Sequence, residues 1–200
     1  MVAYKLYYFD FDGGAGEPIR NAFRIAKIPF EDVRVKHGEW PDLKKSDKCL
    51  YGQMPLLQID SEMYAQSMSI LRYVGKLTGL YPTDPVEALR VDELLDCVLD
   101  IRTKITPTYG LPEAERIAAR QKLVTDFIRP HLARMECRLH HGGKFTGFAV
   151  GDKLTIADLV IANEINGFRS GRLDGIDRGI ADNAEAMSSV TENVKRHLTK

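Results

Sequence analysis

Tyr51-Gly-Gln-Met-Pro-Leu-Leu-Gln-Ile59, with Gln66-Ser67 a short turn later, is the stretch that decides how this chain folds. Pro55 begins a short predicted strand over 56–59 and leaves Met54 extended, with a backbone amide and carbonyl free to pair with an extended peptide. Ser67 begins a predicted helix, whose unpaired first amides and positive dipole end can hold a carboxylate. Both features together suit a small acidic peptide. An edge strand, a turn and a capped helix also occur in many α/β proteins, so the pattern alone leaves both interpretations open.

The surrounding pattern changes from mixed to helical along the chain. A strand over 4–9, a helix over 17–28 and a strand over 30–36 form a βαβ unit, which two short strands and a helix complete. The segment 79–85 carries two prolines and no periodicity, so we place the domain boundary there. Beyond it, apolar residues step by three and four through Val91–Ile105, and 113–140 forms a second long helical segment. The part from 171 to 200 is punctuated by glycine and then polar, and its pattern does not place a last helix.

Composition excludes several classes of protein. The 200 residues are 44% hydrophobic, and 28 basic residues balance 28 acidic ones, so there is no electrostatic reason to expect nucleic acid or an anionic membrane as a partner. No window approaches eighteen apolar residues, and the N-terminus starts a strand rather than a signal peptide, so we expect a cytoplasmic protein. Cys49, Cys97 and Cys137 are odd in number and widely spaced, which indicates neither a disulfide framework nor a zinc site.

Three short motifs argue against other functions. Asp12-Gly-Gly-Ala15 holds no cysteine, so a thioredoxin-like disulfide reductase is excluded, and the glycines up to Gly16 lack the third glycine of a dinucleotide-binding turn. The adjacent His140 and His141 point to different helix faces without further ligands and are interpreted as a solvated helix end, not a metal site. Thr155-Ile-Ala-Asp158 is a capping box, with Leu154 and Leu159 as its hydrophobic staple, so its role is in folding.

Several short motifs along the chain, in their order and spacing, resemble those of a cytosolic glutathione transferase of the tyrosine-using kind, closest to the sigma-like group. The resemblance implies a thioredoxin-like α/β N-terminal domain (2–80) that binds glutathione, followed by an all-α domain (81–200) that forms the electrophile pocket. It also implies a homodimer that conjugates glutathione, as co-substrate and without a cofactor, to electrophiles. The matching residues are Leu6-Tyr-Tyr-Phe9, Glu17-Pro-Ile-Arg20, Trp40, Lys44, Gly52-Gln-Met-Pro55, Gln66-Ser67 and Gly151–Asp158.

The chemistry that the resemblance implies needs a thiolate. The thiol of glutathione, with a pKa of ~8.5, is only a few per cent ionised at neutral pH, and a tyrosine hydroxyl that donates to the sulfur can favour the anion. Tyr8 lies at the end of the first predicted strand, where ligands gather, and glycines follow it. Tyr7 is its rival, but adjacent strand residues face opposite ways, and the family alignment selects Tyr8 as the catalytic residue.

The remaining glutathione contacts are carried over from the family pattern. Trp40 and Lys44 would hold the glycine end, although they also suit a surface anchor and a solvated charge. Asp92, Asp96 and Asp100 step by four along one helix face, and Asp100 would reach the γ-glutamyl amine across the dimer. Gln53 and Met54 would hold the cysteinyl backbone, and Gln66 and Ser67 the γ-glutamyl carboxylate.

Some positions depart from the family pattern. Ala15 stands where many relatives have arginine, which removes a charge near the thiol. Arg102 and Lys104 lie on the expected pocket wall and suggest a pocket less apolar than usual, which puts prostaglandin isomerase activity in doubt. A non-catalytic, ligand-binding relative with the same fold therefore remains the alternative, and the sequence does not choose the electrophile. The expected electrophile pocket comprises Phe11, Arg102, Ile105, Thr106 and Tyr109.

Overall fold

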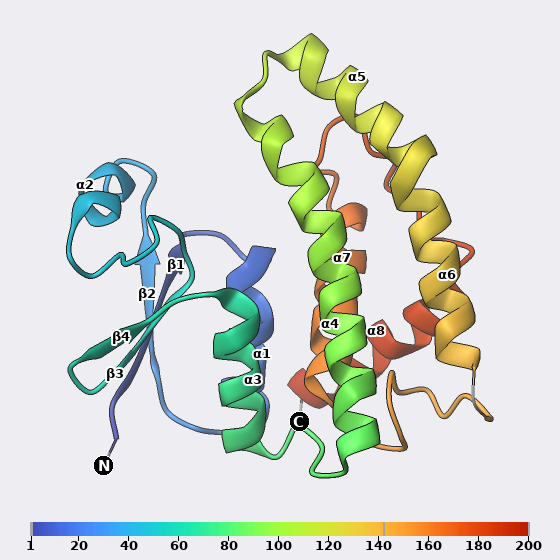
Figure 1. Cartoon of the computed structure of the whole chain (residues 1–200), viewed down its shortest axis with the longest axis horizontal. Coiled ribbons are helices and arrows are strands. Elements are labelled where there is room, and N and C mark those ends of the chain that lie inside the picture. The colour runs from blue at the N-terminus through green and yellow to red at the C-terminus, as the bar shows by residue number, and fades with distance from the viewer. Residues whose placement is uncertain (1, 142, 200) are drawn as a thin grey trace. The chain divides into compact units, whose positions relative to one another are not determined.

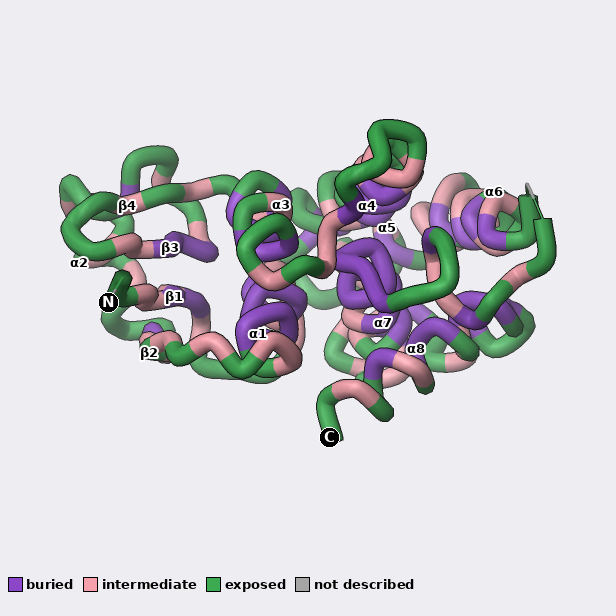
Figure 2. Tube along the Cα trace, turned by 90° about the horizontal axis from the view of Figure 1, so that it is seen from below, coloured by how far each residue is buried: buried purple, intermediate pink, exposed green. Residues whose placement is uncertain are grey.

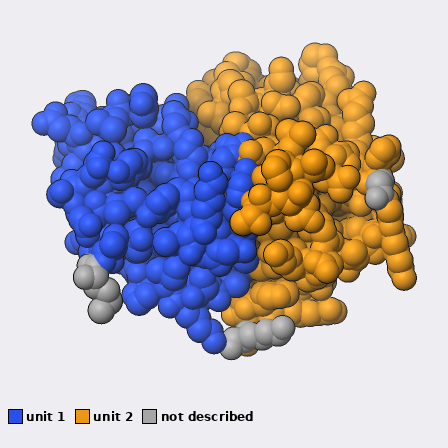
Figure 3. Space-filling model, turned by 60° about the horizontal axis from the view of Figure 1, so that its bottom comes forward, with its two compact units in different colours: residues 1–81 blue, residues 82–200 orange. Residues whose placement is uncertain are grey.

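The computed structural model describes residues 2–141 and 143–199. The chain forms two compact units, residues 1–81 and residues 82–200, which Figure 3 distinguishes by colour. Each has its own buried apolar residues. No helix in the described part of the chain combines the length and apolar character needed to cross a membrane.

Unit 1 is built on a four-stranded mixed sheet with the order β2-β1-β3-β4 (Figure 1). Its central pairs are β1 with β2, which run parallel, and β1 with β3, which run antiparallel. The predicted strands 4–9 and 56–59 have the bounds expected, whereas the predicted strand 30–36 is one residue shorter at each end. The strands are β1 (Tyr4–Phe9), β2 (Glu31–Val35), β3 (Leu56–Ile59) and β4 (Glu62–Tyr64).

Helices α1 and α3 pack against each other on one face of this sheet (Figures 1 and 2). Helix α1 ends at Ile25, not at Ile28 as predicted, because Lys27 adopts φ 54° and turns the chain. The amide of Lys27 then donates to Arg24 and that of Ile28 to Phe23, which is a Schellman closure before Pro29 is reached. The helices of unit 1 are η1 (Gly14–Gly16), α1 (Glu17–Ile25), α2 (Trp40–Lys45) and α3 (Ser67–Thr78).

The core of unit 1 follows the apolar spacing of its helices. Ile70, Leu71, Val74 and Leu77 recur at helical spacing along α3, and the first three are buried, whereas Leu77 is 41% exposed. Leu77 lies in the last turn of α3, just before Gly79 ends the helix in the left-handed conformation. The other buried apolar residues of unit 1 include Leu6, Leu56 and Leu57 of the sheet and Ile19, Ala22 and Phe23 of α1.

Unit 2 is helical, with α7 (Ile156–Arg169) as its most buried helix (Figure 2). The predicted segment 113–140 is one helical run, interrupted by a π-helical turn at Val124–Ile128. The last helix, which the sequence pattern left unplaced, is α8 (Glu185–Leu198), and it packs on α7. The other helices of unit 2 are α4 (Pro85–Ile105), η2 (Thr106–Gly110), α5 (Glu113–Leu123), η3 (Val124–Ile128) and α6 (Arg129–His140).

The capping box at the start of α7 is present as predicted. The Asp158 carboxylate accepts from the backbone amide and the hydroxyl of Thr155, both at 2.8 Å, and from the amide of Ala149 at 2.7 Å. Burial raises the pKa of Asp158 to about 6, against the opposing effect of these hydrogen bonds. Leu154 and Leu159 are both buried, so the box and its staple fix the entry of the chain into α7.

A buried cation that the sequence analysis did not predict joins α5 to the loop before α8. Arg120 is 1% exposed, donates to the hydroxyl of Thr108 at 2.8 Å and pairs with Asp174. Arg116 donates to the same carboxylate at 2.6 Å. The paired arginines therefore connect this loop to η2 and α5, which the pattern of apolar residues does not show.

Candidate active site

Strand β1 places its two adjacent tyrosines on opposite faces of the sheet. Tyr8 is 7% exposed, whereas Tyr7 is half-buried and donates its hydroxyl to the side-chain oxygen of Gln58 at 2.9 Å. The hydroxyl oxygen of Tyr8 instead accepts from the backbone amide of Ala15, also at 2.9 Å. Tyr7 therefore belongs to the sheet, and Tyr8 faces the loop that follows β1.

Glycines in that loop let the backbone approach the Tyr8 ring closely. A Cβ atom at Gly14 would lie 2.5 Å from the Tyr8 hydroxyl oxygen, and one at Gly16 would lie 2.6 Å from the ring carbon Cγ. Gly14 also has φ 65°, a conformation that glycine adopts without strain. Both positions therefore need glycine for the ring of Tyr8 to remain where it is.

The stretch before β3 holds Gln53 and Met54. Met54 lies in a bend, and its bond to Pro55 is cis. Gln53 is exposed and Met54 half-buried, and the thiol of the buried Cys49 lies 3.6 Å from the Gln53 carbonyl oxygen. The Cys49 thiol therefore donates a hydrogen bond to the backbone of this stretch.

Helix α3 begins at Ser67 with an open N-terminus. Its N-cap, Gln66, is exposed, has φ 73° and makes no side-chain hydrogen bond to the first amides of the helix. A carboxylate can accept hydrogen bonds from such unpaired amides. Ser67 is half-buried at the same end, so the geometry suits the predicted carboxylate site.

The short helix α2 carries the predicted Trp40 and Lys44 on one side. The ring of Trp40 meets the edge of the Phe9 ring at a centroid distance of 5.6 Å, and the Lys44 ammonium lies 6.0 Å from the centroid of the Trp40 ring. Phe9 ends β1 next to Tyr8, and Phe11 stacks on it with a centroid distance of 6.3 Å. An aromatic cluster thus connects α2 with the end of β1.

The predicted site residues of unit 2 differ from one another in burial and in their hydrogen-bond partners. Arg102 does not present a free charge, because its Nε donates to Glu164 at 2.9 Å. Ile105 is 4% exposed, and the hydroxyl of Thr106 donates to a backbone carbonyl of α4. Tyr109 is 62% exposed and lies under Arg120, 5.0 Å from ring centroid to guanidinium carbon. Asp100 is exposed on α4.

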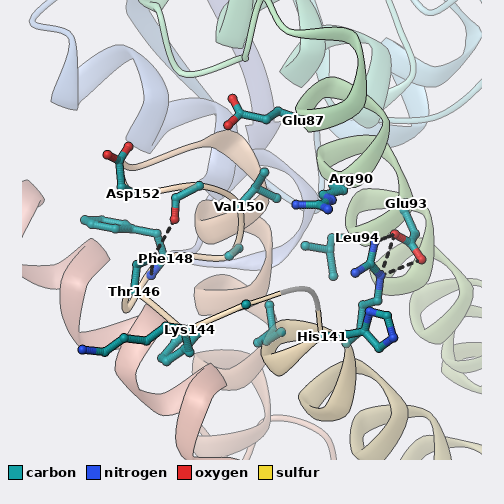
Figure 4. A pocket seen from close by; sticks show the side chains of 16 residues that line it. Glu87, Arg90, Glu93, Leu94, His141, Lys144, Thr146, Phe148, Val150 and Asp152 are labelled. Atoms are coloured by element: carbon teal, nitrogen blue, oxygen red, sulfur yellow. Dashed lines mark hydrogen bonds and ion pairs between the residues drawn. The ribbon is translucent and has the colours of Figure 1, made fainter.

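A separate cavity of about 420 Å³ lies within unit 2 but does not gather these residues. Arg90 points into it, beside Leu94 and Val150, and Arg138 is engaged by Glu93 at 2.7 Å (Figure 4). Besides His141, the described lining residues include as many basic as acidic side chains, so their formal charges balance. Those charged residues are Arg90, Arg138 and Lys144 against Glu87, Glu93 and Asp152.

Comparison with known proteins decides the family. Residues 4–76 match the model of the glutathione S-transferase N-terminal domain, and residues 99–198 match that of the C-terminal domain. Glutathione S-transferase 1 of Ascaris suum is 36% identical over 174 residues, which cover 85% of this chain and 82% of that protein. The chain belongs to the glutathione S-transferase family.

Two solved structures extend this likeness to the whole fold. Monomeric glutathione S-transferase 3 of the hookworm Necator americanus is 31% identical, with a TM-score of 0.77 over 98% of this chain and 94% of that one. Prostaglandin synthase D of Nilaparvata lugens is 27% identical, with a TM-score of 0.83 over 97% and 92%. The fold is therefore thioredoxin-like in unit 1 and all-α in unit 2, and the protein is a glutathione transferase that binds glutathione.

The ion pairs of Arg20 behind Tyr8 in this transferase were not predicted, although Glu17 and Arg20 belong to the matching motif. Arg20 is 0% exposed and pairs with Asp32 at 2.9 Å and Glu17 at 3.1 Å. Although burial acts in the opposite direction, hydrogen bonds from Arg20 and Arg34 hold the pKa of Asp32 below its usual value. A signal was present, because Arg20 lies within the apolar stripe of α1, where a solvated arginine does not fit.

Proposed function

We propose that this transferase is a tyrosine-using, sigma-like member of its family, in which the hydroxyl of Tyr8 donates to the sulfur of glutathione and stabilises the thiolate. The observation that carries this proposal is the hydrogen bond from the Ala15 amide to the Tyr8 hydroxyl oxygen. A hydroxyl that already accepts from a fixed amide directs its own proton elsewhere and donates more strongly. The amide also supplies a polar contact at the position where the family pattern has arginine.

Replacing Tyr8 by phenylalanine tests this role. We expect Tyr8→Phe to keep the fold and nearly the same glutathione affinity while conjugation falls on the order of 10²-fold. The pKa of the bound thiol, followed by thiolate absorbance, should return towards ~8.5. Tyr7→Phe is the matched control, because its hydroxyl is engaged by Gln58. An equal loss of conjugation in Tyr7→Phe would mean that Tyr8 is not the specific donor and that the proposed assignment is wrong.

The glutathione contacts proposed in unit 1 come from three neighbouring segments. The open end of α3 at Gln66 and Ser67 would take the γ-glutamyl carboxylate, and Trp40 with Lys44 on α2 would take the glycine end. Gln53 and Met54 would pair with the cysteinyl backbone between them. We expect retention on immobilised glutathione and release by free glutathione, and calorimetry without binding at millimolar glutathione would contradict this assignment.

We further propose that the protein is a homodimer in which Asp100 contacts glutathione bound to the partner subunit. Asp100 is exposed, and no hydrogen bond or ion pair to it is found among the described residues. The Necator americanus relative is described as monomeric, so size-exclusion chromatography with light scattering is needed first. Asp100→Asn should weaken glutathione binding and Asp92→Asn should not. Full affinity in Asp100→Asn, or in a diluted monomer, would make each site self-contained.

The electrophile pocket is proposed to involve Phe11, Arg102, Thr106 and Tyr109. Because Glu164 compensates Arg102, this wall is less charged than the sequence suggested, whereas Ile105 is too buried to offer much surface. We propose detoxification of electrophiles in the cytoplasm, without a cofactor. An assay panel of aromatic halides, lipid peroxides, unsaturated aldehydes, isothiocyanates and a prostaglandin endoperoxide would identify the substrate class, and no turnover of any would favour a ligand-binding role.

A further inference from the structure

Arg20 is a charged side chain that lies wholly inside unit 1, with 0% exposure. Burying an ion is unfavourable unless its charge and its donors are matched. Here Nε donates to Asp32 at 2.9 Å, and Nη1 donates to Glu17 and to the Phe11 carbonyl, both at 3.1 Å. Nη2 donates to the Phe9 carbonyl at 3.4 Å. The guanidinium therefore ties two backbone carbonyls after Tyr8 to α1 and β2.

The same contacts control the loop that reaches Tyr8. The Glu17 oxygen Oε2, which accepts from Arg20, also accepts from the amide of Gly13 at 3.2 Å, so Arg20 and the loop share one acceptor atom. Two residues further on, the amide of Ala15 donates to the hydroxyl oxygen of Tyr8. The loop is consequently fixed at its start by Arg20 and near its middle by Glu17, and this fixes where the Ala15 amide lies.

The charge of Arg20 acts on Tyr8 less directly than its geometry does. The guanidinium carbon lies 5.6 Å from the centroid of the Tyr8 ring, close enough for a cation–π contact. However, the carboxylates of Glu17 and Asp32 both pair with the guanidinium and offset its field at the ring. The larger effect is therefore positional, because the strength of a hydrogen bond falls steeply with poor distance and angle.

We propose that Arg20 is a positioning residue for Tyr8: it holds the loop whose Ala15 amide donates to the Tyr8 hydroxyl, and thereby determines how strongly Tyr8 stabilises the bound thiolate. This proposal rests on the proposed function of Tyr8. It extends the site to a side chain that does not touch the substrate. Lysine cannot replace Arg20, because an ammonium does not present the planar fork that reaches two carboxylates and two carbonyls at once.

The test is the pH profile of Arg20→Lys. We expect the bound thiol to become less acidic by about one pKa unit, so that kcat/KM falls about 10-fold at a pH well below the thiol pKa and approaches the wild-type value near pH 9. The KM for glutathione should change little, because none of the proposed glutathione contacts is altered. A folded Arg20→Lys protein with the wild-type thiol pKa would overturn the proposal.

Arg24→Gln is the matched control on the same helix. Arg24 contacts the same two carboxylates, Glu17 at 3.0 Å and Asp32 at 3.9 Å, but neither loop carbonyl. We expect its thiol pKa and kcat/KM to equal those of the wild type. If Arg24→Gln shifts the thiol as much as Arg20→Lys does, the effect is one of general charge, and the positioning role is wrong.

A double-mutant cycle with Tyr8→Phe separates this inference from the function on which it rests. If Tyr8→Phe leaves the thiol pKa unchanged, the proposed role of Tyr8 fails. If it raises that pKa but Arg20→Lys does not, only the positioning role fails. If both are right, Arg20→Lys adds no further shift in the Tyr8→Phe background. Should Arg20→Lys not fold, Asp32→Asn takes its place, with a smaller shift in the same direction expected and an unchanged thiol pKa contradicting the proposal.

Discussion

Helices α3 and α7 begin in opposite ways, and the difference separates a site for a ligand from a device for folding. At α7, Thr155 has an extended backbone and the wholly buried Asp158 accepts hydrogen bonds from it. At α3, Gln66 has φ 73° and gives no side-chain cap. Every helix start leaves amides without intrahelical partners. Helix α7 supplies the acceptor from its own chain, whereas α3 leaves that place for water or for a ligand.

The open end also carries backbone strain that the closed end lacks. A positive φ at a residue with a side chain costs roughly 1 to 3 kcal/mol and is found where the surrounding structure imposes it, often at functional sites. Gln66 has this conformation, whereas Thr155, at φ −128°, does not. Substitutions at α7 should therefore change the stability of the fold, and substitutions at α3 should change glutathione binding.

The largest effect is expected from Asp158→Ala. It removes the N3 carboxylate of the capping box and leaves the buried amide of Thr155 and the half-buried amide of Ala149 without an acceptor, so we expect the free energy of unfolding to fall by about 3 to 4 kcal/mol. Denaturant unfolding measures this loss. Calorimetry at a temperature where the variant is folded should give the wild-type glutathione affinity. A weakened affinity in the folded variant would mean that α7 also belongs to the binding site.

The pH dependence of stability sharpens the same point. Burial raises the pKa of Asp158 from 3.8 to about 6, so the folded state holds this proton more tightly than the unfolded state does. Its contribution to stability is then complete below about pH 4 and is lost as the pH rises through 6, by at most about 3 kcal/mol. Relative to Asp158→Asn, which does not titrate, the wild type should lose unfolding free energy between pH 4 and pH 7. A gain over this interval would show that the three hydrogen bonds outweigh burial.

Ser67→Ala should give the opposite result to Asp158→Ala. If the open end of α3 holds the γ-glutamyl carboxylate, the loss of one hydroxyl donor to a charged group weakens glutathione binding by roughly 1 to 3 kcal/mol. The free energy of unfolding should change by less than about 0.5 kcal/mol, because Ser67 is not the cap of its helix. Calorimetry and denaturant unfolding of the same protein measure both. An unchanged affinity would remove Ser67 from the site.

The sequence predicted those parts of the fold that depend on local pattern. The bounds of β1 and β3, the start of α3 and the capping box of α7 all follow from alternation, proline placement and cap residues. The end of α1 was wrong because the left-handed Lys27 carries no glycine signal. Helix α8 was unplaced although Met187, Val190 and Val194 have helical spacing, because the polar residues between them obscured it.

The supports of the site could not be predicted in the same way. Tyr8, Gln66 and Ser67 were proposed from the order of the motifs, whereas the burial of Arg20 depends on Asp32 of β2 and on two backbone carbonyls. Such partners come together only in the folded chain. The ion pair between Arg102 and Glu164 could not be predicted either, because Glu164 lies on α7, far from Arg102 in the sequence.

The smallest expected effect isolates the strain at Gln66. Glycine adopts a positive φ without cost, whereas Gln66→Ala keeps the strain and removes the same side-chain contacts. We expect both variants to weaken glutathione binding equally, and Gln66→Gly to exceed Gln66→Ala in unfolding free energy by about 1 kcal/mol. Denaturant midpoints at equal slope measure that difference. At α7 the corresponding pair, Thr155→Gly and Thr155→Ala, should both be destabilised, because the residue there is extended and its hydroxyl donates to Asp158. If Gln66→Gly were no more stable than Gln66→Ala, the start of α3 would hold no strain, and the two helix ends would differ only in the presence of a side-chain cap.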